Sequence, residues 1–346
     1  MTVPIDQIVS TIKDLVHIPS PTGWSTSAID YVEKRWTQTR WEMKRNAKGA
    51  LTLTIPGEDQ EIHRFVTAHV DTLGAMVKEI KSDGKLAFMK IGGFGWFAID
   101  GVYCTIHTED EKEIRGTILA TNPSVHVNPE ADTKREQHTM AVRLDAKVQG
   151  KEDVEQLGIQ VGDFISFDPN YEESETGFIK TRHLDDKASV AVLVELVLEM
   201  KKQGIVLPHT THIQIGTFEE VGFGANSNIP AQVREFLAVD MGAIGEGQST
   251  DEFTVSICAM DGVGPYNYKL RKKLVKLAKE HKIPYQIDLY PFYGSDAGAA
   301  LKAGEDVMHA LIGPGVDASH AFERTHRDSL QATYQLLNEY LKTESL

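Results

Sequence analysis

The sequence has few cysteines, little positive charge and no long apolar run. Only two cysteines occur among 346 residues, Cys104 and Cys258, and they form no CxxC pair. They therefore indicate neither a disulfide framework nor a cysteine zinc site. The formal net charge of -14 argues against nucleic acid or an anionic membrane as a partner, because both select basic surfaces. No run approaches about 18 apolar residues and no leader-like segment opens the chain, so we expect a cytoplasmic protein without a membrane span.

The chain contains two kinds of sequence pattern. Residues 72–170 show short alternating stretches separated by turn signals, a pattern that indicates a small β-barrel or sandwich. Helical and strand patterns alternate on both sides of this segment. We therefore predict an α/β fold, namely an α/β/α sandwich around a mainly parallel mixed sheet with an inserted small β-barrel. Residues 1–71 and 171–346 would form the main domain, and residues 72–170 the insertion.

The elements of the main domain are predicted from the two periodicities. Helices are expected at residues 5–16, 25–36, 186–202, 268–281 and 328–342, and strands at residues 50–55, 64–68, 211–218, 236–240, 285–289 and 307–312. The helix at residues 186–202 is apolar nearly all round, which indicates burial against the sheet.

One stretch carries two adjacent carboxylates. The apolar run that begins at Gln214 ends in Glu219 and Glu220, and a turn containing two glycines follows. Successive side chains of a strand point to opposite faces, so both carboxylates can share a site only where the strand stops. Such a pair suits a metal site, because one carboxylate can bind the ion while the other moves a proton.

Other potential ligands also end or follow predicted strands. They are His69-Val70-Asp71, Asp185-Asp186, Asp240 and His320. Each alone is weak evidence, since such residues commonly cap helices or end turns. Together they place two imidazoles and several carboxylates at strand ends, where an open sheet binds its ligands. Mixed nitrogen and oxygen ligands favour zinc, cobalt or manganese, and two ions sharing a bridging carboxylate would use such a set.

The chain resembles a known family over essentially its whole length. The resemblance rests on AHVDTLGAMV, HLDDKASVAV, TFEEVGFGAN, LAVDMG, YGSDAGAA and ASHAFERTH, in this order. These motifs are similar to those of the glutamyl aminopeptidase and tetrahedral aminopeptidase family of dinuclear metallopeptidases (clan MH). That family also contains proteins labelled FrvX-like or endoglucanase.

The resemblance implies a role for each candidate residue. The ligands of two divalent ions, Zn²⁺ or Co²⁺ with Mn²⁺ as a further option, would be His69, Asp185, Glu220, Asp240 and His320. Asp185 would bridge the ions, and Glu220 would complete one shell with either histidine while Asp240 completes the other. Asp71 would hold the ring of His69, and Glu219 would be the general base. His326 remains an alternative to His320, and the loop at residues 293–298 would help to form the substrate pocket.

The activity implied is metal-dependent removal of N-terminal residues from short peptides with a free N-terminus, through a metal-bridged water. A dinuclear deacylase or carboxypeptidase is the alternative, because the same motifs serve that chemistry equally well. An endoglucanase or a non-catalytic metal-binding protein is less favoured. The resemblance further implies that the insertion mediates dimers and pore formation in a homo-oligomer, up to a dodecamer. The preferred N-terminal residue and the native metal stay open.

Overall fold

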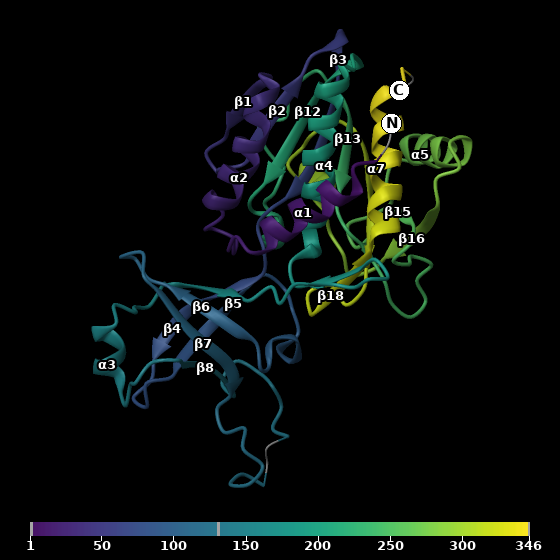
Figure 1. The fold of residues 1–346 in the computed structure, drawn as a ribbon. Coiled ribbons are helices and arrows are strands. Elements are labelled where there is room, and N and C mark those ends of the chain that lie inside the picture. Colours follow the sequence, from purple (N-terminus) through teal and green to yellow (C-terminus); the bar gives the residue numbers. More distant parts are fainter. Residues whose placement is uncertain (1–2, 130–131, 345–346) are drawn as a thin grey trace.

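A computed structural model describes residues 3–129 and 132–344 of the chain. Figure 1 shows a body in which helices cover a large sheet, and a barrel below it that is built from the middle of the sequence. This arrangement confirms the predicted fold class, an α/β sandwich with an inserted barrel. Within the described residues no helix is both long enough and apolar enough to span a bilayer.

The main sheet has parallel strands at its centre and antiparallel pairings toward its edges. Its order is β1 (Glu42–Arg45), β2 (Leu51–Ile55), β12 (Leu207–Gly216), β3 (Gly57–His69), β13 (Val233–Val239), β17 (Met308–Val316), β15 (Val255–Asp261) and β16 (Tyr285–Tyr290), with β14 (Gly242–Ala243) beside β17. The strands β12, β3, β13 and β17 run parallel to one another. Their carboxyl ends therefore meet at one edge of the sheet, the edge that faces the barrel.

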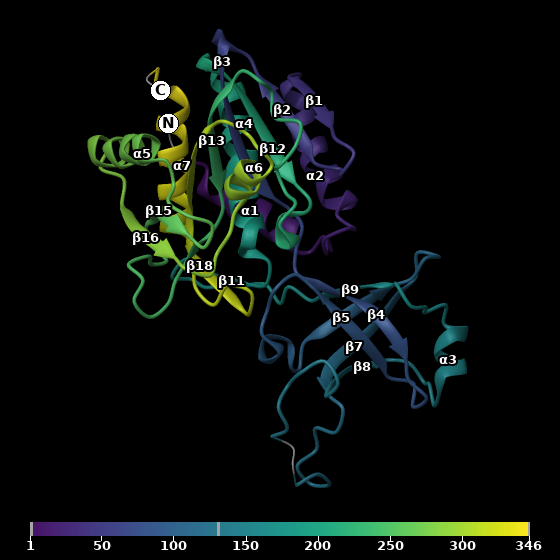
Figure 2. The same cartoon turned by 180° about the vertical axis from the view of Figure 1, so that it is seen from behind.

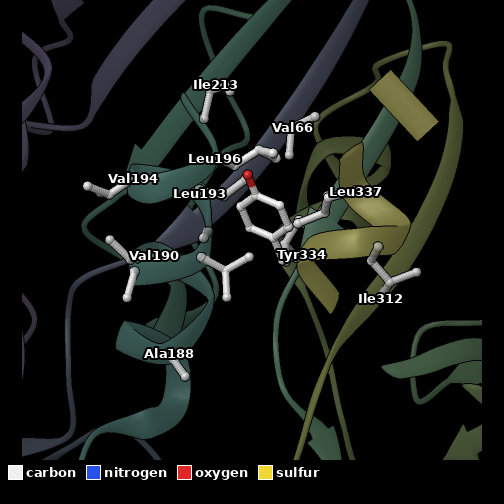
Figure 3. Close-up of a cluster of buried hydrophobic side chains, with 14 of the residues drawn as sticks. Val66, Ala188, Val190, Leu193, Val194, Leu196, Ile213, Ile312, Tyr334 and Leu337 are labelled. Atoms are coloured by element: carbon white, nitrogen blue, oxygen red, sulfur yellow. The ribbon is translucent and has the colours of Figure 1, made fainter. Parts of the chain in front are cut away.

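Most helices cover one face of this sheet. They are α1 (Ile5–Val16), α2 (Thr26–Trp36), α4 (Leu184–Gln203), α5 (Tyr268–Glu280) and α7 (Arg327–Lys342), with the short helix η1 (Thr37–Thr39) after α2. The opposite face carries α6 (Asp296–Lys302), which lies in front of the sheet in Figure 2. Figure 3 shows Leu193 and Leu196 of α4 beside Tyr334 of α7, in the buried cluster that also contains Val66 of β3. Helix α4 is buried on nearly all sides because it has neighbours on nearly all sides, as its apolar sequence predicts.

The barrel has a core of its own. Six strands close it in the order β4 (Gly74–Ile80), β5 (Leu86–Ile91), β8 (Met140–Leu144), β7 (Glu113–Ala120), β6 (Tyr103–His107) and β9 (Phe164–Phe167). The helices η2 (Trp96–Ile99) and α3 (Lys151–Gln156) lie in its connections. Alternating side chains such as Val77, Phe88 and Ile118 fill its interior. Closure leaves no sheet edge unpaired, which suits strands this short.

Some elements were not predicted. Strands β1, β15 and the helix α6 are absent from the predicted set, as is a small sheet of β10 (Glu172–Glu173), β11 (Phe178–Thr181) and β18 (Glu323–His326). Strand β1 is a short polar edge strand, and α6 is a short helix rich in alanine and glycine, so neither shows a clear period. In the small sheet, β11 pairs with β18, which lies more than a hundred residues later in the chain, and local patterns cannot reveal such a pairing.

Candidate metal centre

The candidate residues meet at the carboxyl edge of the main sheet. Strand β3 ends at His69, directly beside Gly216 at the end of β12, and Asp240 follows the end of β13. Glu219 and Glu220 lie in the 3₁₀ turn η3 (Glu219–Val221), which begins just after β12 stops. The turn lets both carboxylates reach one site, as the sequence predicts.

Two groups of potential ligand atoms share Asp185. His69, Asp185 and Asp240 form one group, and Asp185, Glu220 and His320 form the other, with the ligand atoms of each group within 4.8 Å of one another. The Oδ1 atom of Asp185 is 3.3 Å from Nε2 of His69, and its Oδ2 atom is 3.2 Å from Nε2 of His320. The Oε2 atom of Glu220 is 3.5 Å from Nε2 of His320, and the Oδ2 atom of Asp240 is 3.9 Å from Nε2 of His69. The geometry therefore groups Glu220 with His320 and Asp240 with His69, a choice that the sequence left open.

The ring of His69 is oriented toward the shared carboxylate. Its Nδ1 donates a hydrogen bond of 2.9 Å to the main-chain oxygen of Asp71, which fixes the tautomer. Its Nε2 is buried, faces the carboxylates of Asp185, Glu219 and Asp240, and has no hydrogen-bond partner among the described residues. Burial alone would lower the pKa of His69, but the neighbouring carboxylates, Asp185 first, raise it well above its usual value.

Asp71 mainly holds the turn that carries the two glutamates. Its carboxylate accepts hydrogen bonds from the backbone N–H groups of Glu219 at 3.2 Å and Glu220 at 3.3 Å, and from the hydroxyl of Thr22 at 2.7 Å. Its Oδ1 atom is also 3.4 Å from Nδ1 of His69. Asp71 therefore links two strand ends, and its carboxylate does more than support one imidazole.

A buried glutamate to which the sequence assigned no role holds the backbone of two residues of the second group. Glu323 accepts hydrogen bonds from the backbone N–H groups of Asp185 at 3.1 Å and His320 at 3.0 Å. Burial raises its pKa to about 8. The motif ASHAFERTH contains this residue, but only its burial between the two segments reveals the positioning role. His326 lies elsewhere, at the N-terminus of α7, where it contacts the main-chain oxygen of Thr176 at 2.8 Å.

The barrel contributes to the position of His320. The Nδ1 atom of this histidine donates to the main-chain oxygen of Gly93, in the connection after β5. Arg182 donates to the main-chain oxygen of Ala98 in η2 and, at 3.0 Å, to that of Ala321. The insertion and the main body thus hold the same loop from two sides.

A pocket of about 370 Å³ opens over both groups. Its inner side includes Asp185, Glu219, Glu220, Asp240 and His320, and its outer wall includes Val263, Phe292, Tyr293, Gly294, Ser295, Ala299 and Lys302. Burial raises the pKa of Glu219 well above its usual value. The predicted loop lines the pocket only with its first residues, because Asp296 turns inward and accepts a hydrogen bond of 3.0 Å from Thr67.

Comparison with known proteins identifies the family. The family model described as M42 glutamyl aminopeptidase matches residues 49–336. A protein of Bacillus subtilis (strain 168), provisionally named aminopeptidase YhfE, is 55% identical over 340 residues, which cover 98% of each chain. The chain belongs to the M42 peptidase family. This M42 peptidase is therefore a hydrolase that acts on peptide bonds, of the aminopeptidase type, and the resemblance in its motifs is confirmed.

Solved structures match the fold of this M42 peptidase. The TET aminopeptidase of the marine sediment archaeon Thaumarchaeota archaeon SCGC AB-539-E09 superposes with a TM-score of 0.89 at 21% identity, covering 99% of this chain and 97% of that one. The TET1 peptidase of Pyrococcus horikoshii, described as assembling into a tetrahedron or a large octahedral shell, gives 0.85 at 23% identity, with 96% and 99% covered. M42 peptidases are metallopeptidases, and the two groups around Asp185 supply candidate ligands.

Proposed function

We propose that this M42 peptidase removes N-terminal residues from short peptides with the help of two divalent ions. The ligands would be His69, Asp185, Glu220, Asp240 and His320. The observation that carries the proposal is the position of Asp185, whose two oxygens face the two histidines from one carboxylate. Nitrogen and oxygen ligands suit zinc, cobalt or manganese.

The residues present fit such ions. Among the described residues, Nε2 of His69 and Oε1 of Glu220 are buried without a hydrogen-bond partner. An unsatisfied buried polar atom costs about 1–3 kcal/mol, and a coordinated cation would remove this cost. Four carboxylates also line the inner side of the pocket, and positive charge there would offset their mutual repulsion.

Glu219 has the position of a general base. It stands outside both ligand groups, lines the pocket, and has its Oε2 atom 3.7 Å from Nε2 of His69. Bound ions would act as Lewis acids and lower the pKa of a water molecule. Glu219 would accept the proton of that water as it attacks the peptide carbonyl and would return the proton to the leaving amine. The bonds from the backbone of Glu219 and Glu220 to Asp71 keep this carboxylate in place.

The test is the substitution Glu219→Gln, assayed on aminoacyl-p-nitroanilides with added Co²⁺ or Zn²⁺ and with a chelator. We expect the wild type to release p-nitroaniline only with metal, and to lose this turnover when the substrate amine is acetylated. The variant should keep both ions and lose about 10²- to 10⁴-fold in kcat. A variant with both ions that cleaves as fast as the wild type would refute the proposal.

The same assay separates the alternatives. Metal-dependent release from N-acyl amino acids, with none from free-amine substrates, would favour a deacylase or a carboxypeptidase. Hydrolysis of a polysaccharide that is insensitive to the chelator would favour an endoglucanase, because a glycosidase needs two carboxylates and no metal.

We also propose that the chain forms a homo-oligomer through its barrel. The assembly described for the P. horikoshii peptidase supports this, as do the exposed side chains of Met89, Phe97 and Tyr103 on the insertion. Light scattering of the purified chain tests the proposal. A particle much larger than one chain is expected, and a monomer at micromolar concentration would contradict it.

A further inference from the structure

The chain segment that follows the two candidate glutamates is bound by the ammonium of a lysine. Lys48 lies in the turn between β1 and β2, where it is half-buried. Its Nζ atom donates to the main-chain oxygens of Phe223 and Gly224 and, at 2.6 Å, to Oδ1 of Asn226. An ammonium has three N–H donors, so these contacts use all of them. Hydrogen bonds from a charged donor are stronger than those between neutral groups.

The backbone of Lys48 holds the chain on the other side of the same turn. Its main-chain oxygen accepts a hydrogen bond of 2.9 Å from the hydroxyl of Thr217, two residues before η3. The base of the turn is closed by a bond of 2.9 Å from the N–H of Phe223 to the main-chain oxygen of Phe218. Lys48 therefore contacts the chain both before and after the two glutamates.

Opposite charges bind the two kinds of backbone group around η3. The carboxylate of Asp71 accepts from the N–H groups of both glutamates, and the ammonium of Lys48 donates to carbonyl groups that follow them. Gly224 is buried, and a buried carbonyl group needs such a partner. Burial lowers the pKa of Lys48, and the carboxylates of Asp296 and Asp71 oppose this shift.

A buried carboxylate limits the position of the same segment from within the protein. A Cβ atom at Gly224 would lie 1.6 Å from Oδ1 of Asp296, so only glycine fits here. The other oxygen of Asp296, Oδ2, accepts a hydrogen bond of 3.0 Å from the hydroxyl of Thr67 in β3. Gly224 therefore has no room to move toward Asp296, and its carbonyl oxygen is held by Lys48.

We propose that Lys48 is a positioning residue, which keeps Glu219 where it can move a proton and Glu220 where it can bind an ion. The proposal rests on the proposed function, because it assumes these roles for the two glutamates. The described residues that line the pocket do not include Lys48, so it acts through the turn. Without the ammonium the turn can shift, and a misplacement of about 1 Å can cost up to about 100-fold in rate.

Three variants test the effect on catalysis. They are Lys48→Met, Lys48→Arg and the control Lys44→Met, which removes the same charge from an exposed position of β1. With saturating Co²⁺ and an aminoacyl-p-nitroanilide that the wild type cleaves, Lys48→Met should lower kcat by about 10- to 100-fold. Its KM should stay within about twofold, because the substrate amine still meets both ions. Lys48→Arg keeps a charged donor and should lose less, and Lys44→Met should match the wild type.

Binding of Co²⁺ separates positioning from a general loss of structure. Glu220 belongs to the group of ligands around His320, so Lys48→Met should weaken the ion beside His320 by about tenfold. The ion beside His69 should bind as in the wild type. The absorption bands of Co²⁺ during a titration follow the two sites. Equal weakening at both sites would overturn the inference, because it would show that Lys48 supports the whole structure and not this turn.

Failure of the inference and failure of the proposed function give different results. If the wild type cleaves the substrate and Lys48→Met keeps its kcat, the inference is wrong and the proposed function stands. If the wild type with bound Co²⁺ cleaves no free-amine substrate, the proposed function fails and the inference falls with it. If Lys48→Met does not fold, Asn226→Ala, which removes one of the three acceptors, should lower kcat by about threefold. An unchanged kcat in Asn226→Ala would then overturn the inference.

Discussion

The two halves of the candidate metal centre are built from different kinds of structure. His69 and Asp240 stand at the ends of neighbouring parallel strands, and the His69 side chain is 1% exposed. His320 stands on the loop between β17 and β18, and its side chain is 34% exposed. The first half consists of His69 and Asp240 with the shared Asp185, and the register of the sheet positions His69 and Asp240. The second half consists of Glu220 and His320 with the shared Asp185, and His320 is positioned by contacts from three separate segments.

This difference gives the inserted barrel a role at the site. Gly93 accepts the hydrogen bond from His320, while Arg182 and Glu323 bind the backbone on either side of that histidine. No barrel residue among those described is in either group of potential ligands, yet the second half depends on where the barrel lies. Substitutions in the barrel should therefore weaken binding of the ion beside His320 and leave binding of the ion beside His69 unchanged.

The largest effect is expected from replacing Asp185, the residue that the two halves share. Asp185→Asn should weaken binding of both ions by more than about 100-fold, because even residues that only support a ligand contribute about 10- to 100-fold. Turnover of aminoacyl-p-nitroanilides should fall with it. Metal content after dialysis, measured by mass spectrometry, tests this, with the exposed Asp306→Asn as the matched control. Two retained ions in Asp185→Asn would show that Asp185 does not bridge them.

The second prediction compares His69 and His320 by how much each contributes to the free energy of unfolding. His69→Ala should lower the free energy of unfolding of the metal-free protein by about 2–4 kcal/mol, because it leaves a cavity and buried carboxylates without their partner. His320→Ala should cost about 1 kcal/mol, since its side chain is partly in water. Urea denaturation in the presence of chelator measures both. Equal losses would mean that the sheet does not support the first half more strongly.

The sequence predicted candidate residues in both halves of the centre, but not the contacts that position the second. A strand that ends in a histidine or a carboxylate is visible in the local pattern, so His69, Asp240 and the pair Glu219 and Glu220 stood out as candidates. Their meeting follows from the rule that parallel strands share a carboxyl edge. That rule does not specify which carboxylate faces which histidine, and the resemblance to a family left this open as well.

The contacts around His320 could not be predicted because they are made between distant segments. Glu323 is close to His320 in sequence, but its second hydrogen bond goes to the backbone of Asp185. Arg182 and Gly93 belong to parts of the chain whose relative position depends on how the barrel packs. Helix α6, with Lys302 at its end, was missed because alanine and glycine give no apolar period.

A smaller effect tests whether the barrel supports only the second half. Arg182→Met removes the donors to Ala98 and Ala321 and should weaken the ion beside His320 by about tenfold, the lower end for a residue that supports a ligand. The ion beside His69 should bind as in the wild type. Titration with Co²⁺, followed by its absorption bands, resolves two sites. Arg135→Met, which removes a barrel ion pair with Asp100, is the control. Equal weakening of Co²⁺ binding at both sites would show that the barrel does not support only the second half.

The smallest effect is expected at His212, which lies on β12 away from both halves of the centre, and it concerns the free energy of unfolding. His212 of β12 is buried, and burial first, with the neighbouring His63 second, lowers its pKa to about 4. In the unfolded chain its pKa would be near the usual 6.5. Between these values the unfolded state binds more protons, so the free energy of unfolding should fall as the pH decreases from about 6.5 to about 4.

The substitution His212→Gln should make the metal-free protein less sensitive to acid in that range. Above pH 6.5 the two proteins should differ only by a constant, because the histidine is then neutral in both states. Thermal denaturation at a series of pH values, with chelator present, measures the slope. The wild-type protein, measured in parallel under the same conditions, gives the reference slope. If His212→Gln also keeps the wild-type slope, His212 does not cause the acid sensitivity and the prediction is wrong.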